Sequence, residues 1–134
     1  MWRVGAILWV IAASAGAETP GGLAAHYAAE AAAAQPKYAP SESAGREFFL
    51  RRFNISAEMP SCSTCHTENP AARGRHAITN KRIPPLTPGA NPDRFTDAAH
   101  VEKWFRRNCT EVVGRECTAA EKSDFIAFLM AFKP

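Results

Sequence analysis

The sequence predicts an all-α fold, and the pattern of apolar residues supports this in two ways. No segment alternates apolar and polar residues as a half-buried strand does. Three segments instead carry apolar residues at helical spacing, and they begin after Ser41, Thr96 and Thr118, which are good helix N-caps. The long segment after Thr67 contains many glycines and prolines, so we expect it to be an ordered loop.

The first residues have the composition of a secretory signal. Arg3 precedes an apolar stretch that ends in Ala15-Gly16-Ala17, which fits a signal-peptidase site. The uncharged run Val4–Ala17 is shorter than the ~20 residues of a membrane-spanning helix, which disfavours the alternative of a membrane anchor. We therefore expect residues 1–17 to be a signal peptide and the mature protein to be periplasmic, with export as its only involvement with a membrane.

Residues 18–40 form an alanine-rich extension. Leu23–Ala34 is a run of strong helix formers that Pro36 must end, which predicts a short helix followed by a linker. A disordered tether is the alternative, because the segment has few apolar side chains with which to dock. The remaining residues, 41–134, are expected to form one domain.

Three helices are expected in residues 41–134. Ser41 should cap a helix that includes Ala44–Phe53, Thr96 a helix over Asp97–Asn108, and Thr118 a helix over Ala119–Phe132. The apolar positions are Phe48, Phe49 and Phe53 in the first helix, Val101, Trp104 and Phe105 in the second, and Phe125, Phe128, Leu129 and Phe132 in the third.

Asn108 shares the predicted apolar face of the second helix, at i+7 from Val101. A polar side chain on such a face needs a partner. Alternatively, Asn108 ends the helix, because asparagine tolerates the left-handed conformation found at helix C-termini. The residues alone leave both interpretations open.

Cys62-Ser-Thr-Cys65-His66 is a C-x-x-C-H motif, the attachment signature of c-type haem. Two cysteines three apart on one helical turn can both form thioethers with the vinyl groups of a porphyrin. His66 then points at the porphyrin face and can ligate the iron as the proximal histidine. The motif predicts one covalently bound haem c, held by Cys62, Cys65 and His66.

Other uses of these cysteines fit less well. A thioredoxin-like C-x-x-C motif needs a βαβ context, which the sequence lacks. A zinc site needs a second ligand pair at metal spacing, whereas Cys109 and Cys117 lie eight residues apart. The charge balance of 16 Lys and Arg against 13 Asp and Glu is only weakly basic, so no nucleic-acid partner is expected.

Three short motifs resemble those of class I cytochromes c. They are Gly45-Arg-Glu-Phe-Phe49 in the N-terminal helix, Pro84-Pro85-Leu86 in the loop, and Ala127-Phe-Leu129 in the C-terminal helix. The resemblance implies helices packed around one covalently bound haem, with Gly45 at a close helix crossing. It also implies that the Pro85 carbonyl accepts the Nδ1 proton of His66, which fixes the tautomer of that ligand.

In this family a methionine is usually the sixth iron ligand, and this sequence departs from that pattern. Met59 precedes the attachment turn, and Met130 lies four residues from the end of the sequence, so neither is well placed. The remaining candidates for the sixth ligand are His76, His100 and Asn108. We expect His76 to lie on the proximal side, and lysines are the least favoured candidates.

The stretch from Arg94 through Trp104 and Asn108 to Cys117 is similar to a narrower family, the sphaeroides haem protein type of cytochrome c. That resemblance implies that Asn108 ligates ferric iron, that Trp104 contacts the haem, and that Cys109 and Cys117 form a disulfide. It also implies that the ferrous form releases Asn108 and binds O2, NO or CO. A hard amide oxygen has little hold on the softer ferrous iron.

Two functions follow. The protein is expected to transfer electrons to or from another exported or membrane cytochrome, and to bind a diatomic gas when reduced. The alternative is a simple electron carrier that is always six-coordinate. A haem enzyme, such as an oxidase, a peroxidase or a nitric oxide dioxygenase, ranks last, because no His and Arg pair is placed like that of a peroxidase. No catalytic residue is predicted. Arg106, Arg107 and Arg115 are expected to form a basic rim that steers an acidic partner.

Overall fold

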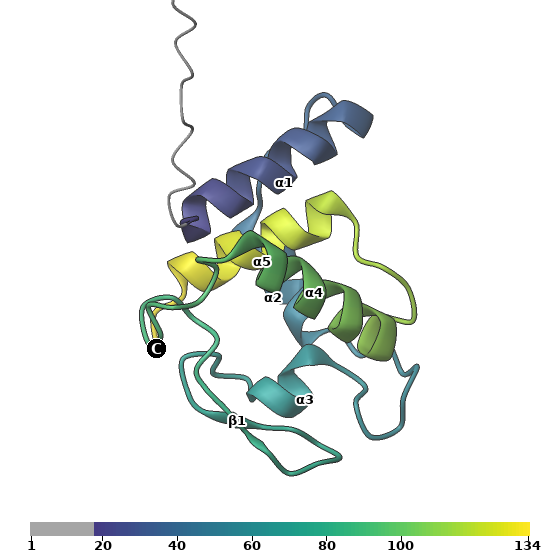
Figure 1. Ribbon diagram of the computed structural model, residues 1–134. Coiled ribbons are helices and arrows are strands. Elements are labelled where there is room, and N and C mark those ends of the chain that lie inside the picture. Colours follow the sequence, from purple (N-terminus) through teal and green to yellow (C-terminus); the bar gives the residue numbers. More distant parts are fainter. Residues whose placement is uncertain (1–17) are drawn as a thin grey trace, which may run out of the picture.

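The computed structural model describes residues 18–134, so the predicted signal peptide lies outside the described residues. The all-α prediction is confirmed, and the two-residue strands β1 and β2 are the one exception in these residues (Figure 1). In chain order the elements are α1 Pro20–Ala34, α2 Glu42–Leu50, α3 Cys62–His66, β1 Gly74–Arg75, β2 Arg82–Ile83, α4 Ala98–Asn108, the π-helix η1 Cys109–Val113, and α5 Ala119–Ala131. None of the helices in residues 18–134 is long and apolar enough to cross a membrane.

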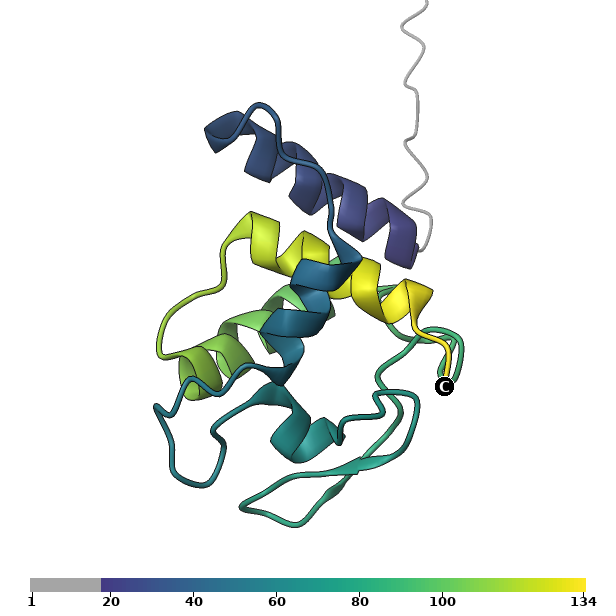
Figure 2. The same ribbon diagram turned by 180° about the vertical axis from the view of Figure 1, so that it is seen from behind.

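The alanine-rich extension contains a helix of 15 residues, α1, and is not a loose tether. Thr19 caps α1 by accepting a hydrogen bond from the Gly22 N–H, and Pro20 lies in its first turn. Leu23 and Tyr27 are almost completely buried, and α1 packs along α5 (Figure 2). Two large side chains are therefore enough to dock this segment.

Helices α2 and α5 cross closely at Gly45, as the class I resemblance implies. A Cβ atom at Gly45 would overlap the backbone carbonyl of Asp124 and lie 2.8 Å from the Cβ of Phe128. The aromatic side chains beside the crossing meet, with ring centroids 5.6 Å apart for Phe49 and Phe128. Glycine is required here because only the absence of a side chain lets the two backbones approach.

Two of the three predicted N-caps are confirmed, and one is wrong. Ser41 accepts from the Ala44 N–H, and Thr118 forms a capping box with Glu121. The helix α4, however, is capped by Asp97, whose carboxylate accepts from the His100 N–H, while the Thr96 hydroxyl donates to the Asp93 carbonyl. Both residue types cap well, so the sequence does not distinguish adjacent candidates.

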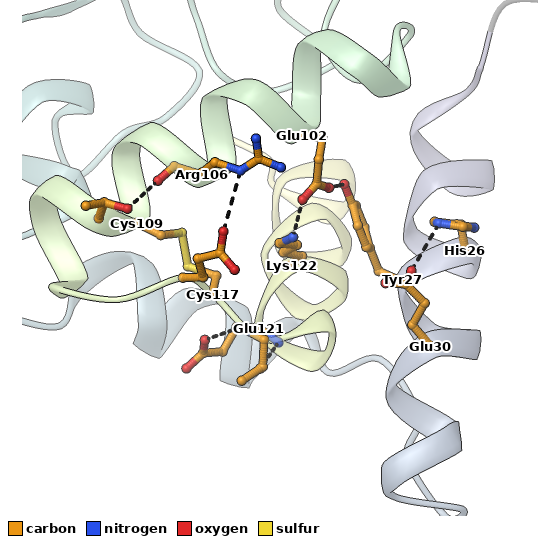
Figure 3. Close-up of polar contacts among 12 residues, drawn as sticks. His26, Tyr27, Glu30, Glu102, Arg106, Cys109, Cys117, Glu121 and Lys122 are labelled. Atoms are coloured by element: carbon orange, nitrogen blue, oxygen red, sulfur yellow. Dashed lines mark hydrogen bonds and ion pairs between the residues drawn. A yellow bond between two sulfur atoms is a disulfide. The ribbon is translucent and has the colours of Figure 1, made fainter.

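A polar cluster joins α1, α4 and α5 (Figure 3). The Glu102 carboxylate accepts hydrogen bonds from the Tyr27 hydroxyl at 2.5 Å and from Lys122 Nζ at 2.6 Å. Burial raises the pKa of Glu102, but hydrogen bonds from Lys122 and Tyr27 outweigh it and lower that pKa. The Tyr27 ring also packs edge-on against Phe105. These contacts fix α4 against the two helices behind it.

Candidate haem site

The attachment motif forms the short helix α3, which begins after Ser61. Cys62 and Cys65 are the free cysteines of residues 18–134, and both are partly buried. Burial raises the pKa of the Cys62 thiol to about 12, so this thiol stays protonated near neutral pH. A thiol of this kind is unlike the activated thiolate of a nucleophile or a disulfide oxidoreductase.

His66 ends the same helical turn and is partly buried. Burial, together with the nearby charge of Arg94, lowers the pKa of His66 to about 4. The imidazole is therefore neutral near pH 7, which is the form that ligates a metal ion.

The β1–β2 hairpin supports the attachment turn from one side. A Cβ atom at Gly74 would overlap the carbonyl oxygen of Cys65 and lie 3.1 Å from the Cα of His66. The Ala77 N–H donates to Cys65 Sγ at 3.3 Å. Gly74 is required for this close approach, a role that no sequence motif indicated.

Arg94 organises the proline loop. Its Nε donates to the Pro85 carbonyl at 2.9 Å, and its terminal nitrogen donates to the Pro84 carbonyl at 2.9 Å. The Asn91 side chain also donates to Pro85, at 3.4 Å. No hydrogen bond from His66 to Pro85 is formed in the part of the chain described, so the predicted His66–Pro85 contact stays a prediction. Sequence reasoning placed Arg94 in the stretch that resembles the narrower family but assigned it no role, because no pattern links it to carbonyls nine and ten residues away.

The protein core covers only part of the face of α4 that the spacing predicts. Val101 is buried and Phe105 packs against the core, but Trp104 is 40% exposed and Asn108 is exposed. Trp104 and Asn108 lie one turn apart, in the part of this face that the protein core does not cover. The exposed indole of Trp104 can pack against a flat apolar group, and the exposed amide of Asn108 beside it can supply an oxygen atom as a ligand.

Asn108 is the last residue of α4, but it is not a left-handed helix cap. Its backbone is right-handed helical, with φ −69° and ψ −37°, and the chain continues into the π-helical turn Cys109–Val113. The left-handed position belongs to Gly114, at φ 81°, whose N–H donates to the Cys109 carbonyl at 3.0 Å. The left-handed cap conformation on which the alternative role of Asn108 rests is therefore not found at this residue. Wide turns of this kind occur often at functional sites.

Cys109 and Cys117 form the predicted disulfide, with Cα atoms 5.7 Å apart (Figure 3). Both residues are buried, and the bond closes the π-helical turn that directly follows Asn108. The disulfide therefore restrains the backbone that positions this side chain.

The disulfide should contribute measurably to stability. Closing a loop of about nine residues stabilises the folded state by roughly 2.5 kcal/mol in the chain-entropy treatment, less any strain. We expect the Cys109→Ser, Cys117→Ser variant to lose about that much free energy of unfolding in urea, followed by far-UV circular dichroism. Alkylation of the unfolded, haem-loaded wild-type protein, in which Cys62 and Cys65 are thioethers, should add mass only after reduction. Two thiols that react without reductant would contradict the assignment.

The other candidate ligands are less well placed. His76 Nδ1 accepts from the N–H groups of Ile78 at 3.2 Å and Thr79 at 3.1 Å, so this ring belongs to the turn of the hairpin. His100 is exposed, with its ring 5.9 Å from that of Trp104. Met59 is buried before α3, and Met130 is exposed on α5.

The arginines expected to form a basic rim each have an acidic partner. Arg106 pairs with Glu116 at 3.5 Å, and Arg107 pairs with Glu111 at 3.4 Å. Arg115 binds both oxygens of Glu121, at 2.7 and 2.9 Å. These pairs cancel much of the positive charge that the predicted steering requires.

The residues present fit a covalently bound haem. Two unpaired thiols and a neutral imidazole lie on one helical turn, which is the donor set of haem c. Trp104 offers an exposed aromatic surface, and Asn108 offers an amide oxygen. No group of three or more His, Cys, Asp and Glu side chains in residues 18–134 is arranged to bind a metal ion directly.

Comparisons with known proteins agree with this site. Residues 35–129 match the family described as "Domain of unknown function (DUF1924)". The cytochrome c-type protein SHP of Cereibacter sphaeroides is 47% identical over 120 residues, which cover 89% of this chain and 88% of that protein. Cytochrome c'' of Methylophilus methylotrophus is 44% identical over 99 residues, which cover 72% and 69%.

Two solved structures have the same fold. The structure of oxidized SHP, described as an oxygen binding cytochrome c, aligns with a TM-score of 0.77 and 44% identity over 87% of this chain and 100% of that one. The crystal structure of oxidized cytochrome c'' from Methylophilus methylotrophus aligns with a TM-score of 0.79 and 39% identity, covering 86% and 95%.

Proposed function

The chain belongs to the DUF1924 family and to the monohaem cytochromes c represented by SHP and cytochrome c'', and from this premise we propose that it is an exported electron carrier that binds O2, NO or CO when reduced. Like these cytochromes, it carries a single covalently attached haem c. The haem iron supplies one-electron chemistry and a coordination position. The surrounding residues decide what occupies that position.

The residues have distinct roles in this proposal. Cys62 and Cys65 hold the haem edge through thioethers, and His66 ligates the iron as a neutral imidazole. Trp104 would pack against the haem, and the Asn108 amide oxygen would bind the oxidised iron. Because a hard amide oxygen has little affinity for the softer ferrous ion, Asn108 would leave this position available to a gas in the reduced protein.

The right-handed backbone of Asn108, followed by a π-helical turn and not by a left-handed cap, is the observation that carries the gas-binding proposal. Because Gly114 provides the helix end, Asn108 has no capping role that would explain an exposed amide beside Trp104. The restraint from the Cys109–Cys117 disulfide holds this position steady. The description of the SHP structure as an oxygen binding cytochrome c supports the same function.

Absorption spectra of the purified wild-type protein test this function. We expect a six-coordinate ferric spectrum and a five-coordinate, high-spin ferrous spectrum that shifts promptly on addition of CO. A ferrous protein that is six-coordinate and indifferent to CO would contradict gas binding. It would favour the alternative of a simple electron carrier, for which His100 is the next candidate ligand because its ring lies beside Trp104.

The cell compartment and the partner form part of the same proposal. We propose that the mature protein is periplasmic and exchanges electrons with another exported or membrane cytochrome. The disulfide supports an oxidising compartment. We also propose that the protein is a carrier and not an enzyme, in keeping with the names of its relatives.

A further inference from the structure

The β1–β2 hairpin and its flanks carry a concentration of positive charge. Between Met59 and Pro92, Glu68 is the one acidic residue, against four lysines and arginines. These cations, all of them exposed, are Arg73, Arg75, Lys81 and Arg82. The hairpin lies at the end of the molecule away from α1, next to α3 (Figure 1). We call these four residues the hairpin cations.

Two of the hairpin cations face each other. Arg75 and Arg82 are directly opposite in the antiparallel register, and both line one hollow together with Arg73. Like charges opposite each other in a strand pair destabilise it. Arg75 does donate to the carbonyl oxygen and the side-chain oxygen of Asn80, but those groups are neutral. The hairpin thus keeps an unfavourable arrangement that an anionic partner would relieve.

The absence of acidic partners distinguishes these residues from the arginines at the end of α4 and beside α5. None of the ion pairs found in residues 18–134 involves a hairpin cation. Arg106, Arg107 and Arg115, in contrast, each contact a glutamate. Of these two arginine clusters in the described residues, the hairpin is therefore the one whose positive charge is not compensated by ion pairs.

The hollow also reaches the attachment turn. It has a volume of about 290 Å³, and its wall includes Thr64, Cys65, Thr67 and Gly74 besides the three arginines. A group bound over this hollow lies against Cys65, to which we assign one of the haem thioethers. The turn of the same hairpin exposes Ile78, which is 59% accessible. An apolar contact bordered by charges is a common arrangement in protein interfaces.

We propose that the hairpin cations, with Ile78, form the docking surface for an acidic redox protein, which exchanges electrons with the haem beside Cys65. This inference rests on the proposed electron-transfer function and names the surface and the kind of partner. Contact with Cys65 favours a redox protein over an anionic membrane, because a membrane gains nothing from access to the haem edge. Steering by such a surface raises association rates mainly at low ionic strength.

Stopped-flow reduction of the ferric holoprotein by an acidic flavodoxin hydroquinone tests the proposal. The hydroquinone gives one electron to the ferric haem and becomes the semiquinone. We expect the Arg75→Glu, Arg82→Glu variant to react at least about tenfold more slowly than wild type at low salt, with the difference largely lost at high salt. The Arg75→Lys, Arg82→Lys variant should keep most of the wild-type rate.

The matched control is Lys37→Glu, Arg46→Glu, which changes the net charge by the same amount at exposed positions outside the hairpin. We expect it to slow reduction by less than about twofold at low salt. If the reversed variant loads haem poorly, Arg75→Gln, Arg82→Gln replaces it and should still be slower than the control.

Two results would overturn the proposal. One is a hairpin variant that reacts no more slowly than the control. The other is binding to phosphatidylglycerol vesicles that the hairpin reversal abolishes while the flavodoxin rate stays unchanged, which would assign the surface to a membrane. CO binding by the ferrous protein should be the same in all variants. A wild-type protein that fails to bind CO would contradict the proposed gas-binding function without affecting the docking surface.

Discussion

Replacing both Cys62 and Cys65 with alanine should abolish the haem that remains with the protein on a denaturing gel. These are the free cysteines of residues 18–134, and they lie three residues apart on the single turn of α3. Two thioethers from that turn are the covalent attachment of haem c, so their loss leaves only ligation, which denaturation breaks. Haem-dependent peroxidase staining measures the result.

The disulfide variant is the matched control for this experiment. Cys109→Ser, Cys117→Ser also removes two sulfur atoms, but it should keep the haem stain, because that pair is already bonded to itself. His66→Gly should leave both thioethers possible and should change the absorption spectrum. Staining that persists in the double alanine variant would place the attachment elsewhere and remove the basis of the site.

Local features of the site could be predicted from the sequence, because the residues concerned are close in the chain. The attachment turn follows from a short motif, whereas the disulfide across eight residues and the Gly45 crossing follow from the resemblance to cytochromes c. Contacts for which no motif or resemblance exists could not be predicted in this way. Gly74 abuts the Cys65 carbonyl, and Tyr27 reaches Glu102 across 75 residues, because the fold brings these segments together.

Within helix α4, too, some features could be predicted from the sequence and others could not. Its existence follows from apolar spacing, but periodicity does not tell how much of the apolar face the protein core covers. In the structure Val101 is buried while Trp104 is exposed, since α4 is held by Phe105 and by the hydrogen bonds of Glu102 to α1 and α5. The π-helical turn after Asn108 has no sequence signature of its own.

Asn108→Ala should change the spectrum of the oxidised protein and leave gas binding by the reduced protein almost unaffected. If the Asn108 amide oxygen ligates only ferric iron, its removal should convert the ferric protein from six-coordinate to five-coordinate or water-ligated. In the ferrous protein the amide has already left, so the rate of CO association should stay within about twofold of wild type. Absorption spectra and CO flash photolysis measure the two effects.

His100→Ala is the matched control, since His100 lies on the same helix and its ring is beside Trp104. We expect this variant to keep the wild-type ferric spectrum. The opposite pattern, with the ferric spectrum altered by His100→Ala and unchanged by Asn108→Ala, would indicate that His100 and not Asn108 is the sixth iron ligand. Because the Asn108 side chain makes no capping hydrogen bond and Gly114 provides the left-handed cap, Asn108→Ala should cost little stability. A spectral change in that variant therefore reports on the iron and not on unfolding, which makes the comparison decisive for the proposed switch.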